Sequence, residues 1–199
     1  CALPISSRLD TINASATTTI SNVSRSKIKM KALCLVAHPD DCVIFAYSYM
    51  FNHPEHDWTV GYLTYLPHEP RAAEFAEFWS RRNIPTVFLG FEDHWHDNEQ
   101  KQLTRWYGLD AAAECQLLAR DYDIVLTHDE HGDYGHIHHR VVHDAVKDHP
   151  GLVTFAPPGQ GTTYILPHGA YSLDELPMHR DIIAGFHPGT HSNSYKERK

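Results

Sequence analysis

The stretch Ala37-His38-Pro39-Asp40-Asp41 lies between two apolar segments and constrains the fold more than any other part of the chain. The segment before it, from Lys31, is rich in Leu and Val and is typical of a strand buried on both faces. The segment after it, through Phe51, is long enough for three helical turns and is apolar almost all round. Because ligands bind at the carboxyl edge of open α/β sheets, the sequence predicts a functional site at this strand-to-helix turn.

The polar residues of this turn allow two interpretations. Polar groups between apolar elements are unfavourable without a partner, and a divalent metal would provide one. His38 and Asp41 are zinc-type ligands, and a catalytic zinc usually has three protein ligands and one open position. In the alternative interpretation, Asp40 or Asp41 only caps the helix, as Asp often does. The motif by itself leaves both interpretations open.

Histidine is the outlier of the composition, with 17 residues among 199, and six of them fall between His128 and His143. Histidine is the commonest metal ligand and the usual general acid or base near neutral pH. For any single histidine of this run, a surface position is the more frequent outcome. For the run as a whole, we expect at least one metal ligand.

The remaining composition excludes several classes of function. A formal net charge of −8 argues against a nucleic-acid partner, because the chain has no basic stripe to meet phosphates. We find neither a secretory signal nor a membrane span. Four cysteines without paired spacing indicate free thiols, so we expect a reducing, cytoplasmic compartment. No glycine fingerprint for a dinucleotide follows a strand. The sequence gives no indication of oligomeric state.

The pattern of elements predicts the fold class. Residues 1–29 have no apolar period, so we expect a poorly ordered extension before a single domain at residues 30–199. Further strands are predicted at 58–66, 85–91, 123–127, 152–156 and 163–166. Helices are predicted at 71–82, at 100–120 with a break at Gly108, at 136–147, and from a capping box at Ser172 toward Phe186. This alternation predicts an α/β, Rossmann-like three-layer sandwich with a mostly parallel sheet.

A second polar segment, from Gly132 to His139, also follows a strand and opens a helix. By the logic of a doubly wound sheet, its tip lies on the same edge as His38. On a helix that begins near residue 136, positions 136, 139 and 143 share one face, and positions 137, 141 and 145 form an apolar face. A histidine face opposite the first motif could complete a metal site.

These motifs resemble those of the PIG-L/LmbE-like zinc-dependent N-deacetylases, which remove acetyl groups from N-acetylglucosaminyl conjugates and related amides. Residues 37–41 match the first motif of that family, and Tyr134-Gly-His-Ile-His-His139 matches the later one. Between them, Arg71-Ala-Ala-Glu74 and Phe88 to Asp93 look like the family's Arg-x-x-Glu and Leu-Gly-x-x-Asp landmarks. The resemblance spans residues 30–147 and implies a hydrolase that uses Zn²⁺ to remove an N-acetyl group from an amino sugar or a related small conjugate.

The resemblance also implies roles for eight residues. They are the metal ligands His38, Asp41 and His139, the general base Asp40, the substrate contacts Arg71 and Asp93, and Tyr134 and His136, which stabilise the oxyanion or protonate the leaving amine.

Two residues depart from the family pattern. Cys42 stands where the family has Glu, and we interpret it as a buried inert thiol. His138 stands where a carboxylate usually orients His136 and raises its pKa. We therefore expect a slower enzyme, or one in which Asp133 substitutes for that carboxylate. The alternative function is a catalytically impaired metal-binding or ligand-binding homologue of the same fold.

Overall fold

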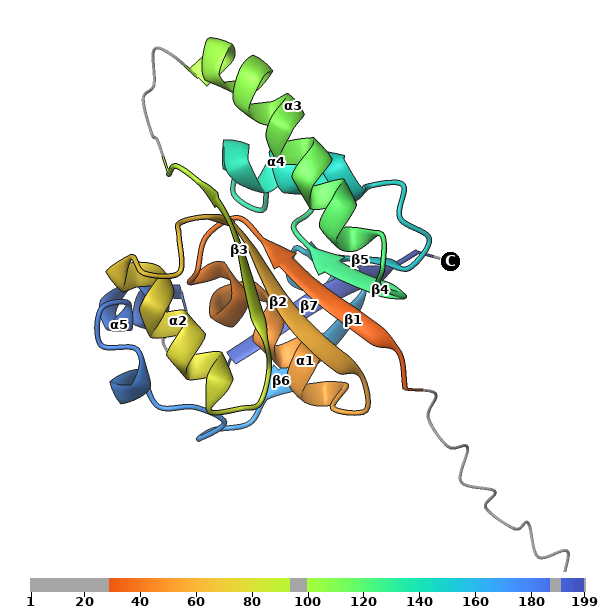
Figure 1. The fold of residues 1–199 in the computed structure, drawn as a ribbon. Coiled ribbons are helices and arrows are strands. Elements are labelled where there is room, and N and C mark those ends of the chain that lie inside the picture. The colour runs from red at the N-terminus through yellow and green to blue at the C-terminus, as the bar shows by residue number, and fades with distance from the viewer. Residues whose placement is uncertain (1–28, 94–99, 187–190, 199) are drawn as a thin grey trace, which may run out of the picture.

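The computed structural model describes residues 29–93, 100–186 and 191–198, and the side chains of residues 100–109 and 191 are not described. Residues 1–28, for which we expected a poorly ordered extension, lie outside the described residues. The strands form one seven-stranded sheet in the order β3-β2-β1-β4-β5-β7-β6 (Figure 1). Their bounds are β1 Lys31–Val36, β2 Asp57–Thr64, β3 Thr86–Phe91, β4 Ile124–Thr127, β5 Leu152–Ala156, β6 Thr162–Leu166 and β7 His191–Glu197.

The sheet is mostly parallel, which confirms the predicted fold class. Strands β1 to β5 pair in parallel, and β7 pairs antiparallel with both β5 and β6. The helices are α1 Tyr47–Asn52, α2 Pro70–Ser80, α3 Gln100–Ala119, α4 Ile137–Val146 and α5 Arg180–Phe186, with a π-helical turn at Cys42–Ala46 and a 3-10 helix at Leu173–Glu175. No helix of the described residues is long and apolar enough to cross a membrane.

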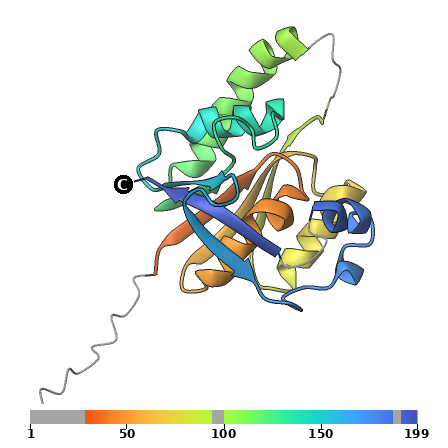
Figure 2. The ribbon, with the colours of Figure 1, turned by 180° about the vertical axis from the view of Figure 1, so that it is seen from behind.

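Helices cover both faces of the sheet, as a parallel sheet requires. Alternate residues of β1 face opposite layers: Cys34 packs in one core cluster with Trp79 of α2, and Leu35 packs in the other with Val142 of α4. Helices α1, α2 and α5 lie on the first side, and α3 and α4 lie on the second (Figures 1 and 2). The predicted burial of the first strand on both faces is confirmed, since every residue of β1 after Lys31 is buried.

The apolar segment after the first motif is helical, but it begins as a π-helix. A π-turn alters the regular pairing of backbone groups, and side chains of β7 bond two carbonyls of this turn. Asn193 donates to the carbonyls of Ile44 and Phe45 at 2.9 and 3.2 Å, and the hydroxyl of Tyr195 donates to Phe45 at 2.6 Å. The tertiary contact with β7 therefore supports the wider turn.

Two predictions about elements were wrong. Helix α3 continues through Gly108 without a break. A glycine costs about 1 kcal/mol in a helix, and the burial of Ala111 and Cys115 further along the helix offsets a penalty of that size. The capping box at Ser172 is present, but it opens only the short 3-10 helix. Pro177 disfavours helical backbone at the residue before it, so α5 begins three residues later.

Strand β7 was not predicted. Its sequence, His191-Ser-Asn-Ser-Tyr-Lys-Glu197, has no alternation of apolar and polar residues. The strand is polar because side chains such as Asn193 and Ser194 make hydrogen bonds to other segments. The strand is stabilised by pairing with β5 and β6 on its two edges, and not by the burial of an apolar face.

The strand order reverses at β1. The chain passes from β1 to β2 and β3 on one side and then returns to β4 on the other side. The carboxyl ends of β1 and β4 therefore flank a topological switch point, which is where open α/β sheets bind ligands. His38 follows β1 and His128 follows β4, so both histidines lie at this point.

Candidate active site and metal centre

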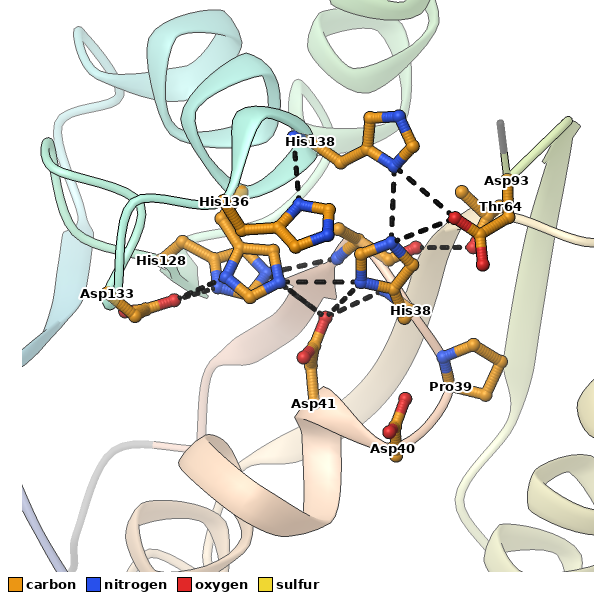
Figure 3. Close-up of polar contacts among 12 residues, drawn as sticks. His38, Pro39, Asp40, Asp41, Thr64, Asp93, His128, Asp133, His136 and His138 are labelled. Atoms are coloured by element: carbon orange, nitrogen blue, oxygen red, sulfur yellow. Dashed lines mark hydrogen bonds and ion pairs between the residues drawn. The ribbon is translucent and has the colours of Figure 1, made fainter. Parts of the chain in front are cut away.

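The eight residues that the family resemblance singles out lie together at the switch point, and Figure 3 labels His38, Asp40, Asp41, Asp93 and His136 among them. Seven of them line one hollow of about 250 Å³, and the eighth, His139, is fully buried and contacts Asp41 and His38. The seven are His38, Asp40, Asp41, Arg71, Asp93, Tyr134 and His136. A larger hollow of about 1270 Å³ borders the beginnings of β1 and β2, at Lys31 and Asp57, and contains none of the clusters of potential metal ligands found among the described residues.

Three atoms from three of these residues form a compact triangle. Asp41 Oδ2 lies 3.2 Å from His38 Nδ1 and 3.2 Å from His139 Nε2, and the two nitrogens are 3.4 Å apart. In a tetrahedral zinc site with ligands at about 2.0–2.1 Å, neighbouring ligand atoms lie about 3.3 Å apart. Two imidazoles and one carboxylate are also a common donor set of catalytic zinc. The residues therefore fit a zinc ion.

The ring orientation of His139 is fixed from behind by Asp133. His139 Nδ1 lies 2.8 Å from Asp133 Oδ2, so Nδ1 donates to the carboxylate, and in the neutral ring that binds a metal Nε2 would present its lone pair to the triangle. The same oxygen accepts from His128 Nδ1 at 2.5 Å, while His128 Nε2 accepts the backbone N–H of Ala37 at 3.0 Å. Both nitrogens of His128 are thus engaged, and we interpret it as a support of the centre. A carboxylate behind a ligating imidazole is the usual arrangement around zinc.

The electrostatics of the triangle favour a cation. Burial lowers the pKa of His38 and of His139, but the carboxylate of Asp41 outweighs burial and raises each pKa to about 9. Burial alone would raise the pKa of Asp41, yet the charges of His139 and His38 hold it well below its ordinary range. The negative charge of Asp41, which raises the pKa of both histidines, would also favour a metal ion bound at this place.

Asp40 lies beside the triangle and belongs to a separate network. Its Oδ1 accepts from Arg71 Nη2 at 2.8 Å, and only 6% of the residue is exposed. Burial and then the charge of Asp41 raise the pKa of Asp40, against the lowering effect of Arg71. Arg71 donates from Nε to His179 Nε2 at 2.8 Å, and His179 donates from Nδ1 to Glu74. Arg71, which the sequence suggested as a substrate contact, is therefore bonded to the expected general base.

His136 lies across the hollow as the N-cap of α4. The backbone N–H of His138 donates to His136 Nδ1 at 3.2 Å, so the proton of the neutral ring is on Nε2. Burial and the neighbouring His38 lower the pKa of His136 to about 3. Tyr134 is 60% exposed at the rim, and burial of its hydroxyl together with nearby carboxylates raises its pKa. Both side chains can donate hydrogen bonds at neutral pH.

The loop before His136 needs unusual backbone conformations. Gly132 and Gly135 have φ of 74° and 96°, and Asp133 has φ of 60°. A side chain at Gly132 would bring its Cβ to 2.5 Å from the carbonyl oxygen of His136. Glycine is therefore required at Gly132, and the strained turn directs Asp133 toward the two histidines behind the site.

The structure clarifies the two departures from the family pattern. Cys42 is fully buried, and its Sγ donates to the carbonyl of Pro39 at 2.9 Å and lies 3.1 Å from the hydroxyl of Tyr62. Burial raises the pKa of this thiol, so the predicted inert character agrees with its surroundings. The ring of His138 is buried and approaches His38, with 3.1 Å between Nδ1 and Nε2. The predicted apolar face of α4 was partly wrong, because the buried residues include His138, Val142 and Ala145.

Three supporting residues received no role from the sequence. His128 directly follows a predicted strand at the carboxyl edge, and that position was a usable signal. Tyr65, which donates to Asp93 Oδ2 at 2.6 Å, directly follows β2, but the strand was predicted to run through residue 66, so the sequence offered no such signal for it. His179 lies 108 residues from its partner Arg71, and no local pattern indicates that contact.

Comparisons with known proteins agree with this geometry. A protein-family model described as PIG-L: GlcNAc-PI de-N-acetylase matches residues 33–149. The fold is similar to that of a deacetylase from the biosynthesis pathway of teicoplanin, with a TM-score of 0.53 and 10% identity over 85% of this chain and 99% of that chain. It is also similar to N,N'-diacetylchitobiose deacetylase from Pyrococcus horikoshii, with a TM-score of 0.50 and 14% identity over 84% of this chain and 83% of that chain. A search of curated proteins found no match.

Proposed function

This chain belongs to the PIG-L family of de-N-acetylases, and from that premise we propose that it is a zinc-dependent hydrolase that removes an N-acetyl group from an amino sugar or a related small conjugate. One observation carries the proposal. The triangle of His38, Asp41 and His139 opens into the same hollow as a second, raised-pKa carboxylate, Asp40. Two of the similar structures are named as deacetylases of a teicoplanin pathway and of a diacetylated sugar, which supports this substrate class.

The three ligands would supply a Lewis acid at the hollow. A zinc ion held there polarises an amide carbonyl and lowers the pKa of water. Asp40 is adjacent in the chain to the ligand Asp41, and its free lone pairs face the hollow that Arg71 also lines. We assign Asp40 the removal of a proton from the attacking water and its transfer to the leaving nitrogen.

We assign His136 and Tyr134 the stabilisation of the negative charge that develops on the acetyl oxygen. Because His136 Nδ1 accepts a backbone N–H, its Nε2–H is the donor available to that oxygen or to the leaving amine. The Tyr134 hydroxyl stays protonated at neutral pH and can make a second such bond. A neutral imidazole is a weaker donor than an imidazolium, so this assignment agrees with the slower enzyme expected from His138.

In this scheme Arg71 positions the general base Asp40. Its guanidinium donates to Asp40 and is itself oriented by His179 and Tyr65. The ion pair fixes one oxygen of Asp40 and leaves the other for water. Asp93 remains the candidate for contact with substrate hydroxyls.

The substitution Asp40→Asn tests the proposal. Asn keeps the size of the side chain and the bond from Arg71 but cannot accept a proton, so acetate release should fall at least about 100-fold. Zinc content should stay the same, because Asp40 is not part of the triangle. Acetate release from a panel of N-acetyl amino sugars and zinc per chain by elemental analysis measure the two effects. Asp121→Asn, at an exposed carboxylate, is the matched control and should change neither.

Two results would contradict the proposal. The first is full activity of Asp40→Asn with zinc bound. The second is a zinc-loaded wild-type protein that releases acetate from no member of the panel, which would favour the catalytically impaired homologue.

A further inference from the structure

A second triangle of potential ligand atoms lies on the other side of the His38 ring. His38 Nε2, which points away from Asp41, is 3.1 Å from His138 Nδ1 and 3.4 Å from Asp93 Oδ1 (Figure 3). The last two atoms are 3.7 Å apart. These distances are close to the separation of about 3.3 Å between ligands of a tetrahedral zinc site. The side chains are 8%, 7% and 21% exposed for His38, His138 and Asp93.

The carboxylate of Asp93 is held in place for such a contact. Its Oδ2 accepts from the hydroxyl of Tyr65 at 2.6 Å, and Arg71 Nη1 lies 3.4 Å from the same oxygen. Those contacts leave Oδ1 directed at the two imidazoles. Carboxylates that ligate metals are regularly fixed by hydrogen bonds from neighbouring residues.

Protons satisfy this triangle poorly. If His38 binds the first metal through Nδ1, its only proton is on Nε2, which faces His138 Nδ1 at 3.1 Å and Asp93 Oδ1 at 3.4 Å. One proton cannot make a well-aligned hydrogen bond to both atoms. A divalent cation in place of the proton would contact all three atoms at once.

We propose that His38 Nε2, His138 Nδ1 and Asp93 Oδ1 form a second divalent-metal site, which shares the ring of His38 with the first site as a bridging imidazolate. The cation takes the place of the His38 Nε2 proton, which passes to solvent. Two imidazole nitrogens and one carboxylate select zinc, cobalt or copper over magnesium or calcium. His136 offers a ring nitrogen within 4.8 Å of His38 and His138 and borders this site.

The site depends on the residue that departs from the family pattern. His138 supplies one of its three donors, and a shorter Asp side chain there would not present an imidazole to His38. Occupancy would also convert Asp93 from a substrate contact into a metal ligand. The inference rests on the proposed function only because both metal sites use His38.

Metal stoichiometry tests the proposal. Wild-type protein dialysed against buffered zinc should hold two zinc ions per chain by elemental analysis, and His138→Leu should hold one. His138→Asn, whose amide can keep a hydrogen bond to His38, provides a second variant if the Leu side chain impairs folding. His143→Leu, on the same helix but outside both triangles, is the matched control and should hold two.

A copper-loaded sample gives an independent readout of the bridge. Two Cu²⁺ ions coupled through one imidazolate should lose much of the electron paramagnetic resonance intensity of isolated Cu²⁺, and His138→Asn should restore the full signal of one ion. One zinc in the wild type, or two zinc ions in both His138 variants, would overturn the proposal. If the wild type holds two zinc ions and His138→Asn holds one, but neither protein releases acetate, the proposed function would be contradicted and the second site would stand.

Discussion

Asp133 lies behind the proposed metal centre and would organise it without entering it. Its Oδ2 accepts from His128 and His139, and its backbone is in the left-handed region. The sequence suggested that Asp133 would support His136 in place of the missing carboxylate. Its hydrogen bonds instead orient the ring of the proposed ligand His139, which would be the more direct effect on metal affinity.

Asp133→Asn should weaken zinc binding by about 10–100-fold. The amide lacks the charge that draws both imidazole N–H groups to one oxygen, while Asn tolerates the positive φ, so the loop should keep its shape. Competition with a chromophoric chelator measures the Kd. Asp144→Asn, at an exposed carboxylate of the next helix, should leave the Kd unchanged. Equal affinity in Asp133→Asn and wild type would show that the carboxylate does not act through His139.

At the scale of elements, the π-helical turn at Cys42–Ala46 and strand β7 depend on one another. The hydroxyl of Tyr195 donates to the carbonyl of Phe45, accepts from the backbone N–H of Tyr49 at 3.3 Å and lies 2.5 Å from Ser48 Oγ. Ser48, Tyr49 and Tyr195 are buried, so water has little access to replace the hydroxyl of Tyr195. A late strand thus stabilises the helix that follows the first motif.

Tyr195→Phe should lower the free energy of unfolding by about 1–3 kcal/mol, because it removes a core hydroxyl that bonds the Phe45 carbonyl, the Tyr49 N–H and Ser48 Oγ. Urea denaturation measures the change. Tyr164→Phe removes a hydroxyl from a neighbouring aromatic ring of the same cluster, at a site with less burial, and should shift the free energy by less than about 0.5 kcal/mol. Equal effects of the two substitutions would argue against a special role of Tyr195 in the turn.

At the scale of the whole molecule, the C-terminal segment is held against α2 by two ionic contacts. His179 bonds Arg71 and Glu74 beside the hollow, and Glu175 receives two bonds from Arg82 at 2.9 and 3.1 Å. This segment also carries Ile182 and Phe186, which line the hollow. Its attachment therefore contributes to both stability and the shape of the site.

The contact between Glu175 and Arg82 predicts a dependence of stability on pH. Hydrogen bonds from Arg82 lower the pKa of Glu175 in the folded state. Its contribution is therefore present above the unfolded value of about 4.3 and is lost as the pH falls through the folded pKa. Glu175→Gln should lower the free energy of unfolding at pH 7 by up to about 1 kcal/mol, with a smaller difference at pH 3.

Urea denaturation of both proteins at the two pH values checks this expectation. Gln can still accept the backbone N–H of Ser172 in the capping box, so the comparison isolates the charge. Glu77→Gln, in the more exposed pair with Arg81, is the control and should show a smaller effect. A difference that grows on acidification would reverse the assigned sign.

The sequence by itself determined the fold class and the region of the site. The apolar strand, the His38 motif and the apolar helix are adjacent in the chain, and local periodicity is enough to detect such units. The rule that polar loops after parallel strands meet at one edge then brought His139 to His38, which are 101 residues apart. The family resemblance added the roles of individual residues, which remain proposals.

Only the tertiary structure decided which atoms face one another. The orientation of His128, the pairing of Arg71 with Asp40 and the π-turn supported by β7 all depend on partners distant in the chain. Such contacts involve single side chains and leave no period in the sequence. For the same physical reason the polar strand β7 was missed: hydrogen bonds to distant partners stabilise it, and apolar alternation detects only elements that bury one face.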